Sequence, residues 1–160
     1  PANEWLLIVD VQLAAGAEPV TLGKTSFGLF AVRVATSMSV QHGGGMIRNS
    51  EGEVNEKEVF GKPARWVDYS GPITATAIEG ATLFDHPANP NHPSAFHVRD
   101  DGWMCASLTF AEARVVAPGK PLQLRYGVFV HAGQPSRGQL QQRWEHFSLV
   151  PPIALKAAAK

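Results

Sequence analysis

The sequence predicts an all-β fold, an antiparallel β-sandwich with one amphipathic helix near its C-terminus. Apolar side chains alternate with a period of two along many short segments, as in strands that bury one face. Turns rich in glycine, proline and aspartate separate these segments at short intervals. One late segment, residues 136–149, changes to helical spacing. Many short strands followed by a single helix favour two packed antiparallel sheets.

The first expected strand covers residues 4–13 and carries apolar side chains on both faces at its start. Its main face holds Trp5, Leu7, Val9, Val11 and Leu13. Leu6 and Ile8 make the second face apolar, which predicts that this strand is covered on both sides. Alternation also predicts strands at residues 30–35 and 122–130, the latter typical of a half-buried antiparallel strand. Shorter strands are expected at residues 19–22, 46–49, 65–69, 73–78, 82–85, 103–110 and 114–116.

The helix is expected within residues 136–149. Leu140, Trp144 and Phe147 recur at intervals of four and three residues, and Ser136 is a suitable N-cap. We expect Trp144 to pack against the sheet. The two prolines at positions 151 and 152 end the helix, and residues 151–160 are expected to form a C-terminal tail.

The composition is typical of one water-soluble globular domain, which we place at residues 1–150. The chain has 160 residues, and its 14 basic and 14 acidic side chains cancel, so no overall field favours nucleic acid or an anionic membrane. The single cysteine, Cys105, excludes an internal disulfide framework. The apolar run at residues 5–9 is far shorter than the roughly 20 residues of a membrane-spanning helix. One cysteine is compatible with a cytoplasmic, periplasmic or secreted protein.

Polar side chains concentrate in residues 85–101, which hold three histidines, one arginine and three aspartates. His86 and His92, together with His97, are weak candidates for metal ligands, because their spacing matches no helical or finger-type motif. The alternative is that these histidines cap and brace a proline-rich surface loop. Asp100 and Asp101, followed by glycine, are equally typical of a hairpin turn. The sequence therefore predicts no cofactor.

His97 and Arg99 are the first candidate site residues. They lie two residues apart, on one face of an expected strand. Histidine can move protons and arginine is a permanent donor, so the pair suits an anionic or polyhydroxylated ligand. The alternative is a salt-bridged pair that joins neighbouring strands.

Trp66 and Asp68 form a second candidate, since they share one face of the strand expected at residues 65–69. Indole rings stack on the apolar faces of sugars, and carboxylates accept hydrogen bonds from sugar hydroxyls. The alternative places Trp66 in the core and Asp68 at a turn. Glu51, which follows another expected strand, is a candidate acid or base, although exposed loop carboxylates are usually not catalytic.

Five segments together resemble the bacterial family catalogued as methane oxygenase PmoA-like. They are residues 28–35 (GLFAVRVA), 49–52 (NSEG), 61–71 (GKPARWVDYSG), 84–90 (FDHPANP) and 96–102 (FHVRDDG). The resemblance extends from Trp5 to His131. It implies a β-rich protein without an assigned activity, similar in fold to the supersandwich of galactose mutarotases and found among sugar-degrading genes. A His-His-Arg-Gly-x-Trp motif of the family has no match here, so the chain resembles either the C-terminal portion of the family, folding alone, or a shortened relative.

We therefore expect a carbohydrate-active or carbohydrate-binding domain. The expected groove is lined by Arg65, Trp66, Asp68, Asp85, His97, Arg99 and Trp103. If it is catalytic, His97 is the general acid and base, with Asp68 or Glu51 as its partner, and Arg99 donates to a developing oxyanion. The reaction would then be proton transfer at a sugar, as in mutarotation or elimination from a keto-glycoside.

The alternative function is a non-catalytic domain that packs against a partner chain, an N-terminal half-domain or its own copies. A half-sandwich exposes edge strands and apolar faces that favour association. Leu6, Ile8 and Phe129 are the candidate contact residues, because each lies opposite the expected core face of its strand.

Overall fold

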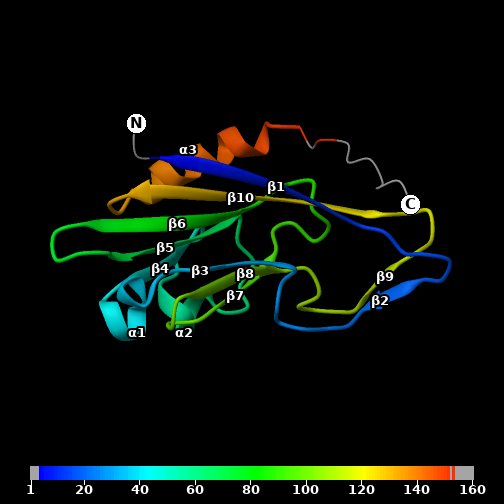
Figure 1. The fold of residues 1–160 in the computed structure, drawn as a ribbon, viewed down its shortest axis with the longest axis horizontal. Helices are drawn as coiled ribbons and strands as arrows, with labels where there is room; N and C mark the ends of the chain where they lie inside the picture. The colour runs from blue at the N-terminus through cyan, green and yellow to red at the C-terminus, as the bar shows by residue number, and fades with distance from the viewer. Residues whose placement is uncertain (1–3, 152, 154–160) are drawn as a thin grey trace.

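The computed structural model describes residues 4–151 and 153, which form three layers (Figure 1). The middle layer is a five-stranded antiparallel sheet, and α3 covers one of its faces. In order across the sheet, its strands are β1 (Trp5–Leu13), β10 (Leu122–Ala132), β6 (Ile78–Asp85), β5 (Trp66–Pro72) and β4 (Met46–Asn49). On the other face lies a three-stranded sheet of β3 (Phe30–Arg33), β8 (Trp103–Ser107) and β7 (Ala95–Val98). The predicted antiparallel sandwich is confirmed.

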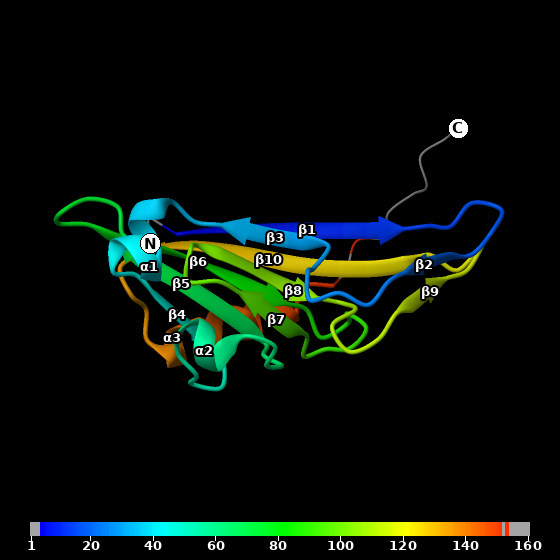
Figure 2. The ribbon, with the colours of Figure 1, turned by 90° about the horizontal axis from the view of Figure 1, so that it is seen from below.

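A short ribbon of β2 (Val20–Leu22) and β9 (Arg114–Val116) extends the molecule at the end away from α1 (Figure 2). The predicted C-terminal helix is present as α3 (Arg137–Ser148). Ser136 begins it with a capping box, because its hydroxyl accepts the Gln139 N–H while the Gln139 side chain accepts the Ser136 N–H. Three short helical segments were not predicted, since each is too short to show helical spacing. They are η1 (Thr36–Met38), α1 (Val40–Gly43) and α2 (Asn55–Val59).

The middle strands β5 and β6 bury both of their faces, and β5 shows how. Val67 and Tyr69 point into the core between the two sheets, whereas Trp66 lies in a second cluster beneath α3. The helix-side cluster consists of Trp66, Phe84, Phe129, Leu140 and Phe147, with Ile8 and Trp144 at its margin. Residues that alternate along one strand therefore enter two different environments, and the face beneath α3 is the one that carries Asp68.

Two predicted strands differ from the structure. Residues 73–77 form the turn between β5 and β6, where the Ile73 N–H donates to the Ala77 carbonyl at 2.9 Å. The Thr74 hydroxyl accepts the Thr76 and Ala77 N–H groups, so threonines that suited a strand instead close the hairpin. The strand expected at residues 103–110 ends at Ser107. Of the predicted tail, only Pro151 and Ile153 belong to the described residues.

The position of α3 determines which of the expected contact residues remain exposed to a partner. Phe129 is 4% exposed because α3 covers it, so its predicted role as a contact residue is wrong. Ile8 packs at the margin of the same cluster, whereas Leu6 remains 43% exposed. The edge strand β1, which was expected to be covered on both sides, is exposed at its start because no described element packs over Trp5 and Leu7. Within residues 4–151 and 153, no helix is long and apolar enough to cross a membrane.

Candidate functional site

The structure distributes the predicted site residues over three places and does not bring them together in one groove. His97, Arg99 and Trp103 lie at the outer face of the three-stranded sheet. Trp66 and Asp68 lie on the opposite side of the molecule, beneath α3. The remaining five lie around the end of β6 and the proline-rich loop, near Trp144; they are Asp85, His86, His92, Arg65 and Glu51.

The outer aromatic face, which we define as Phe27, Phe60, His97 and Trp103, is built on β7 and β8. The Phe27 ring lies over His97, with ring centroids 4.6 Å apart, and meets Trp103 edge-on at 6.4 Å. Phe60 approaches the edge of His97 at 5.0 Å. Phe27 itself is 57% exposed, so this face offers an aromatic ring to solvent.

A glycine lets the loop before β3 lie directly on β8 and so places Phe27. A Cβ atom at Gly28 would stand 2.1 Å from the Ala106 carbonyl oxygen, a distance that no side chain permits. The Gly28 N–H donates to the Cys105 Sγ at 3.1 Å, and the Ser107 hydroxyl donates to the Phe27 carbonyl at 3.3 Å. The position of Phe27 is therefore fixed by the backbone of β8.

Two ion pairs border the outer aromatic face. Arg33 binds Asp101 at 3.2 Å, and its guanidinium lies over the Trp103 ring. Arg99 binds Glu56 at 2.5 Å, and its guanidinium lies over Phe60. Each pair is electrically balanced, so the face combines aromatic rings with planar donors and acceptors and carries no net charge.

His97 lies beneath this face and is only 2% exposed. Its Nδ1 is 3.1 Å from the Ser26 hydroxyl. Burial, reinforced by the nearby charge of Arg99, lowers the pKa of His97 below its usual range. The imidazole is therefore held neutral, between Phe27 and Phe60.

Asp68 is fully buried and is the centre of a polar cluster on the helix side. Its Oδ1 binds His131 Nε2 at 2.8 Å and the Thr82 hydroxyl at 2.9 Å. Its Oδ2 accepts hydrogen bonds from the Ser70 hydroxyl at 2.6 Å and from Arg48 Nη2 at 2.7 Å. The four partners come from β10, β6, β5 and β4, so one carboxylate joins four strands.

This cluster determines the charge of Asp68. Burial alone raises the pKa of Asp68, but the hydrogen bond and charge interaction with His131, and the hydrogen bonds from Ser70 and Arg48, outweigh it. The net result is a pKa below 3.8, so the carboxylate is ionised at neutral pH. His131 Nδ1 is buried and lacks a hydrogen-bond partner within the part of the chain that the structure describes.

Neither expected partner carboxylate reaches His97. Asp68 and His97 lie on opposite sides of the core between the sheets. Val67 and Tyr69, the neighbours of Asp68 on β5, point into that core, so Asp68 points away from it. Glu51 instead binds Arg65 at 3.3 Å. His131, which sequence analysis missed, continues the alternation of β10 two residues after Phe129, and this alternation was the available signal.

Asp85 holds the proline-rich loop against the sheet. Its Oδ1 accepts a hydrogen bond from the Asn89 amide at 2.7 Å, and its Oδ2 accepts the Ser94 N–H at 2.9 Å. The same Oδ2 binds His92 Nδ1 at 2.8 Å, and His92 stacks on Trp144 with an interplanar angle of 7°. These contacts support the bracing role that was the alternative to metal binding.

His86, the other weak metal candidate, is also engaged within the loop. Its Nδ1 accepts the Ala88 N–H at 3.1 Å, and its ring meets Phe147 edge-on. Burial is the main cause that lowers the pKa of His86. Among residues 4–151 and 153, no three histidine, cysteine, aspartate or glutamate side chains form a group that could hold a metal ion.

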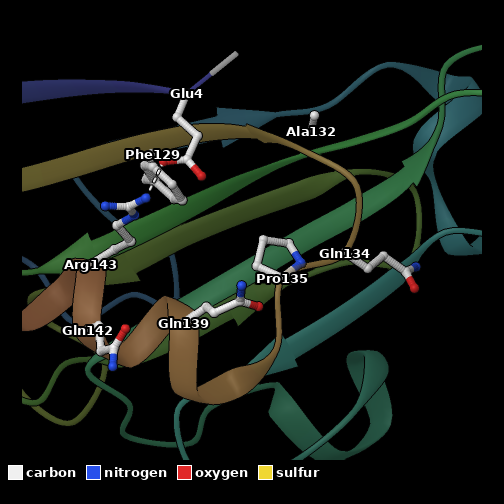
Figure 3. Close-up of a pocket in the computed structure, with 8 residues that line it drawn as sticks. All are labelled: Glu4, Phe129, Ala132, Gln134, Pro135, Gln139, Gln142 and Arg143. Atoms are coloured by element: carbon white, nitrogen blue, oxygen red, sulfur yellow. Dashed lines mark hydrogen bonds and ion pairs between the residues drawn. The ribbon is translucent and has the colours of Figure 1, made fainter. Parts of the chain in front are cut away.

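A cleft of about 410 Å³ lies between α3, the end of β10 with the loop that follows it, and Glu4, which precedes β1. Figure 3 shows the residues that line it. None of the predicted site residues lines it. Glu4 and Arg143 form an ion pair beside Phe129, and the Gln139 carbonyl already accepts the Ser136 N–H. The cleft is lined by Glu4, Phe129, Ala132, Gln134, Pro135, Gln139, Gln142 and Arg143. Its charged groups balance each other, and part of its polar lining serves the helix cap.

Comparison with protein families shows which family the chain matches. A family model described as a family of unknown function, DUF6807, matches residues 1–145. This model does not carry the PmoA-like name that the five sequence segments suggested. No curated protein and no solved structure is similar enough to the chain to match it.

Gly80 provides a first test of the Asp68 cluster. A Cβ atom there would lie 2.3 Å from His131 Cε1 and 2.8 Å from the Ser70 hydroxyl, because the imidazole crosses β6 above this glycine. We expect Gly80→Ala to lower the free energy of unfolding by about 1–3 kcal/mol, the usual cost of overpacking, in a urea titration. Gly16→Ala is the control, since nothing lies within 4 Å of its added Cβ. Equal stability of the two variants would contradict this packing.

The lowered pKa of Asp68 predicts a pH dependence. Because the folded-state pKa of Asp68 lies below 3.8, the ionised carboxylate stabilises the fold fully above pH 3.8. This stabilisation is lost as the pH falls through the folded-state pKa. At neutral pH, Asp68→Asn should reduce the free energy of unfolding by about 3–5 kcal/mol, since it breaks a buried ion pair. The difference between wild type and variant should shrink in urea titrations below pH 3.8. A difference that stays constant down to the acid limit would refute this assignment.

Proposed function

The chain belongs to DUF6807, a family of unknown function, and from its geometry we propose that it is a carbohydrate-binding β-sandwich domain. The ligand would lie on the outer aromatic face. The observation that carries the proposal is Phe27, which presents a 57% exposed ring beside Trp103, between two balanced ion pairs. The resemblance of five segments to PmoA-like proteins found among sugar-degrading genes supports the same ligand class.

The chemistry of this face suits a neutral sugar. The C–H faces of a pyranose pack on aromatic rings, as on Phe27. Sugar hydroxyls both donate and accept hydrogen bonds. The neighbouring Arg33 guanidinium can donate to them, and the Asp101 carboxylate can accept from them. A charged ligand would gain less here, because each arginine already has a carboxylate partner.

Binding is favoured over catalysis by the position of His97. A general acid or base must come within hydrogen-bond reach of the proton that it moves. His97 is 2% exposed beneath Phe27, and both expected partner carboxylates lie elsewhere. Proton transfer at a bound sugar would require Phe27 to leave its place, whereas binding requires no such movement.

The proposal predicts that Phe27→Ala weakens sugar binding. We would first find a ligand by titrating the protein calorimetrically with neutral mono- and disaccharides, including 3-keto forms. Loss of an aromatic contact worth about 0.5–1.5 kcal/mol should then raise the dissociation constant about 2- to 12-fold. Because Phe27 is mostly exposed, the thermal midpoint of the variant should stay close to that of wild type.

Gln142→Ala, in the cleft of Figure 3, is the matched control. Its side chain is exposed, and we expect unchanged sugar affinity. Loss of affinity in Gln142→Ala with full affinity in Phe27→Ala would move the sugar to the cleft beside α3 and reject the outer aromatic face. Failure of all tested sugars to bind would reject the proposed ligand class.

A second candidate function is association through β1. Trp5 is 74% exposed, Leu7 60% and Val130 39%, and all three lie on the face of the middle sheet that opposes α3. Within the described residues β1 is an edge strand, with β10 as its one partner. Exposed apolar side chains on an edge strand favour pairing with another chain or with a second copy.

This second candidate predicts a concentration-dependent mass. Sedimentation equilibrium should show wild-type self-association, or co-sedimentation with a partner chain, that Trp5→Ser reduces. Val115→Ser, which changes another exposed apolar residue, on β9, should leave the mass unchanged. A strictly monomeric wild type at high concentration, without any bound chain, would count against this role.

A further inference from the structure

A small cavity of about 190 Å³ lies on the helix side of the sheet, between β4, β5 and the start of α3. It is lined by Arg48, Asn49, Gly52, Val54, Trp66 and Arg137. The lining combines two cationic side chains with the apolar walls of Trp66 and Val54. The cavity is smaller than the roughly 300–1,000 Å³ of sites for drug-sized ligands, so a molecule of monosaccharide size or smaller suits it.

Asp68 holds the Arg48 guanidinium in place, and one Arg48 donor has no acceptor among the described residues. Arg48 Nη2 binds the buried Asp68 at 2.7 Å, which fixes the guanidinium. Its Nε is buried and has no hydrogen-bond partner in the part of the chain that the structure describes. A buried guanidinium N–H without an acceptor is costly, so an oxygen ligand at this position would stabilise the site.

Arg137 provides a second cationic group at the cavity. Its Nε donates to the Ser50 carbonyl at 2.7 Å, which draws the side chain across Gly52 toward the cavity. Over residues 4–151 and 153, its terminal nitrogens form no ion pair, in contrast to those of Arg48. Glu51 is bound to Arg65, and Glu53 accepts a hydrogen bond from the Asn49 amide. The terminal nitrogens of Arg137 therefore remain available to an anionic ligand.

We propose that this cavity binds a small organic carboxylate, with the anionic group between Arg48 and Arg137 and its carbon skeleton against Trp66 and Val54. Planar guanidinium groups match the geometry of carboxylate oxygens. Two of the walls are apolar, which favours an organic acid over a fully hydrated inorganic anion.

The site does not depend on the proposed function. It faces α3, whereas the outer aromatic face lies beyond the second sheet. It also differs in ligand class, because Arg33 and Arg99 beside the outer aromatic face each bind a carboxylate, whereas Arg137 at this cavity binds none within the described residues. Either site can therefore fail its test without affecting the other.

The test uses D-glucuronate, with D-glucose as the same ring without a carboxylate and inorganic phosphate as an anion without a carbon skeleton. We expect calorimetric titration to detect glucuronate binding that weakens as ionic strength rises. Arg137→Ala should raise the dissociation constant about 10-fold or more, as expected for a lost charge-assisted hydrogen bond. Its thermal midpoint should change little, because the Arg137 side chain is exposed.

Arg143→Ala is the matched control, since it removes an arginine from the same helix at a site where Glu4 balances the charge. It should leave glucuronate affinity unchanged. Arg48→Lys retains the charge but loses the planar donor group, and it should weaken binding while Asp68 keeps a cationic partner. If Arg137→Ala and Arg143→Ala weakened glucuronate binding equally, the affinity would depend only on the net charge of the protein, and this result would overturn the proposal. Absence of glucuronate binding, or binding of phosphate alone, would also overturn it.

Discussion

The structure depends on one buried carboxylate. Asp68 accepts hydrogen bonds from four side chains that belong to β4, β5, β6 and β10. Without them the burial of this charge would be strongly unfavourable, and with them it fixes the helix-side register of four strands at once. This arrangement requires glycine at position 80, because the His131 imidazole crosses β6 where any side chain would stand. The hydrogen bonds of Asp68 and the absence of a side chain at Gly80 therefore depend on each other.

Because β5 and β6 are covered on both faces, the polar groups on the two sides of the middle sheet are separated from each other. On the helix side, Asp68 is fully occupied and α3 covers the aromatic residues around it. On the other side lies the core, and beyond it the outer aromatic face with Phe27. Residues that are close in sequence, such as Asp85 and His97, serve different layers for this reason. The proposed sugar surface and the proposed carboxylate cavity are a consequence of this layering.

The sequence was sufficient for the fold class, α3 and most strands, since burial on one face of a strand leaves a period of two. It also placed His97, Arg99 and Trp103 on one surface, because they lie in one hairpin. It could not show that Asp68 pairs with His131, which is 63 residues away, since such a contact depends on strand order across the sheet. It likewise missed Phe27, which the backbone contact of Gly28 with β8 places over His97.

The most direct test of sugar binding at the outer aromatic face is a nitrogen–proton NMR titration that follows the indole signals of the four tryptophans. Trp103 lies at the proposed surface, whereas Trp66 is fully buried and Trp144 stacks on His92. We predict that a bound neutral sugar shifts the Trp103 signal and leaves the signals of Trp5, Trp66 and Trp144 in place. Shifts confined to the other tryptophans, with Trp103 unchanged, would contradict the assignment of the binding surface.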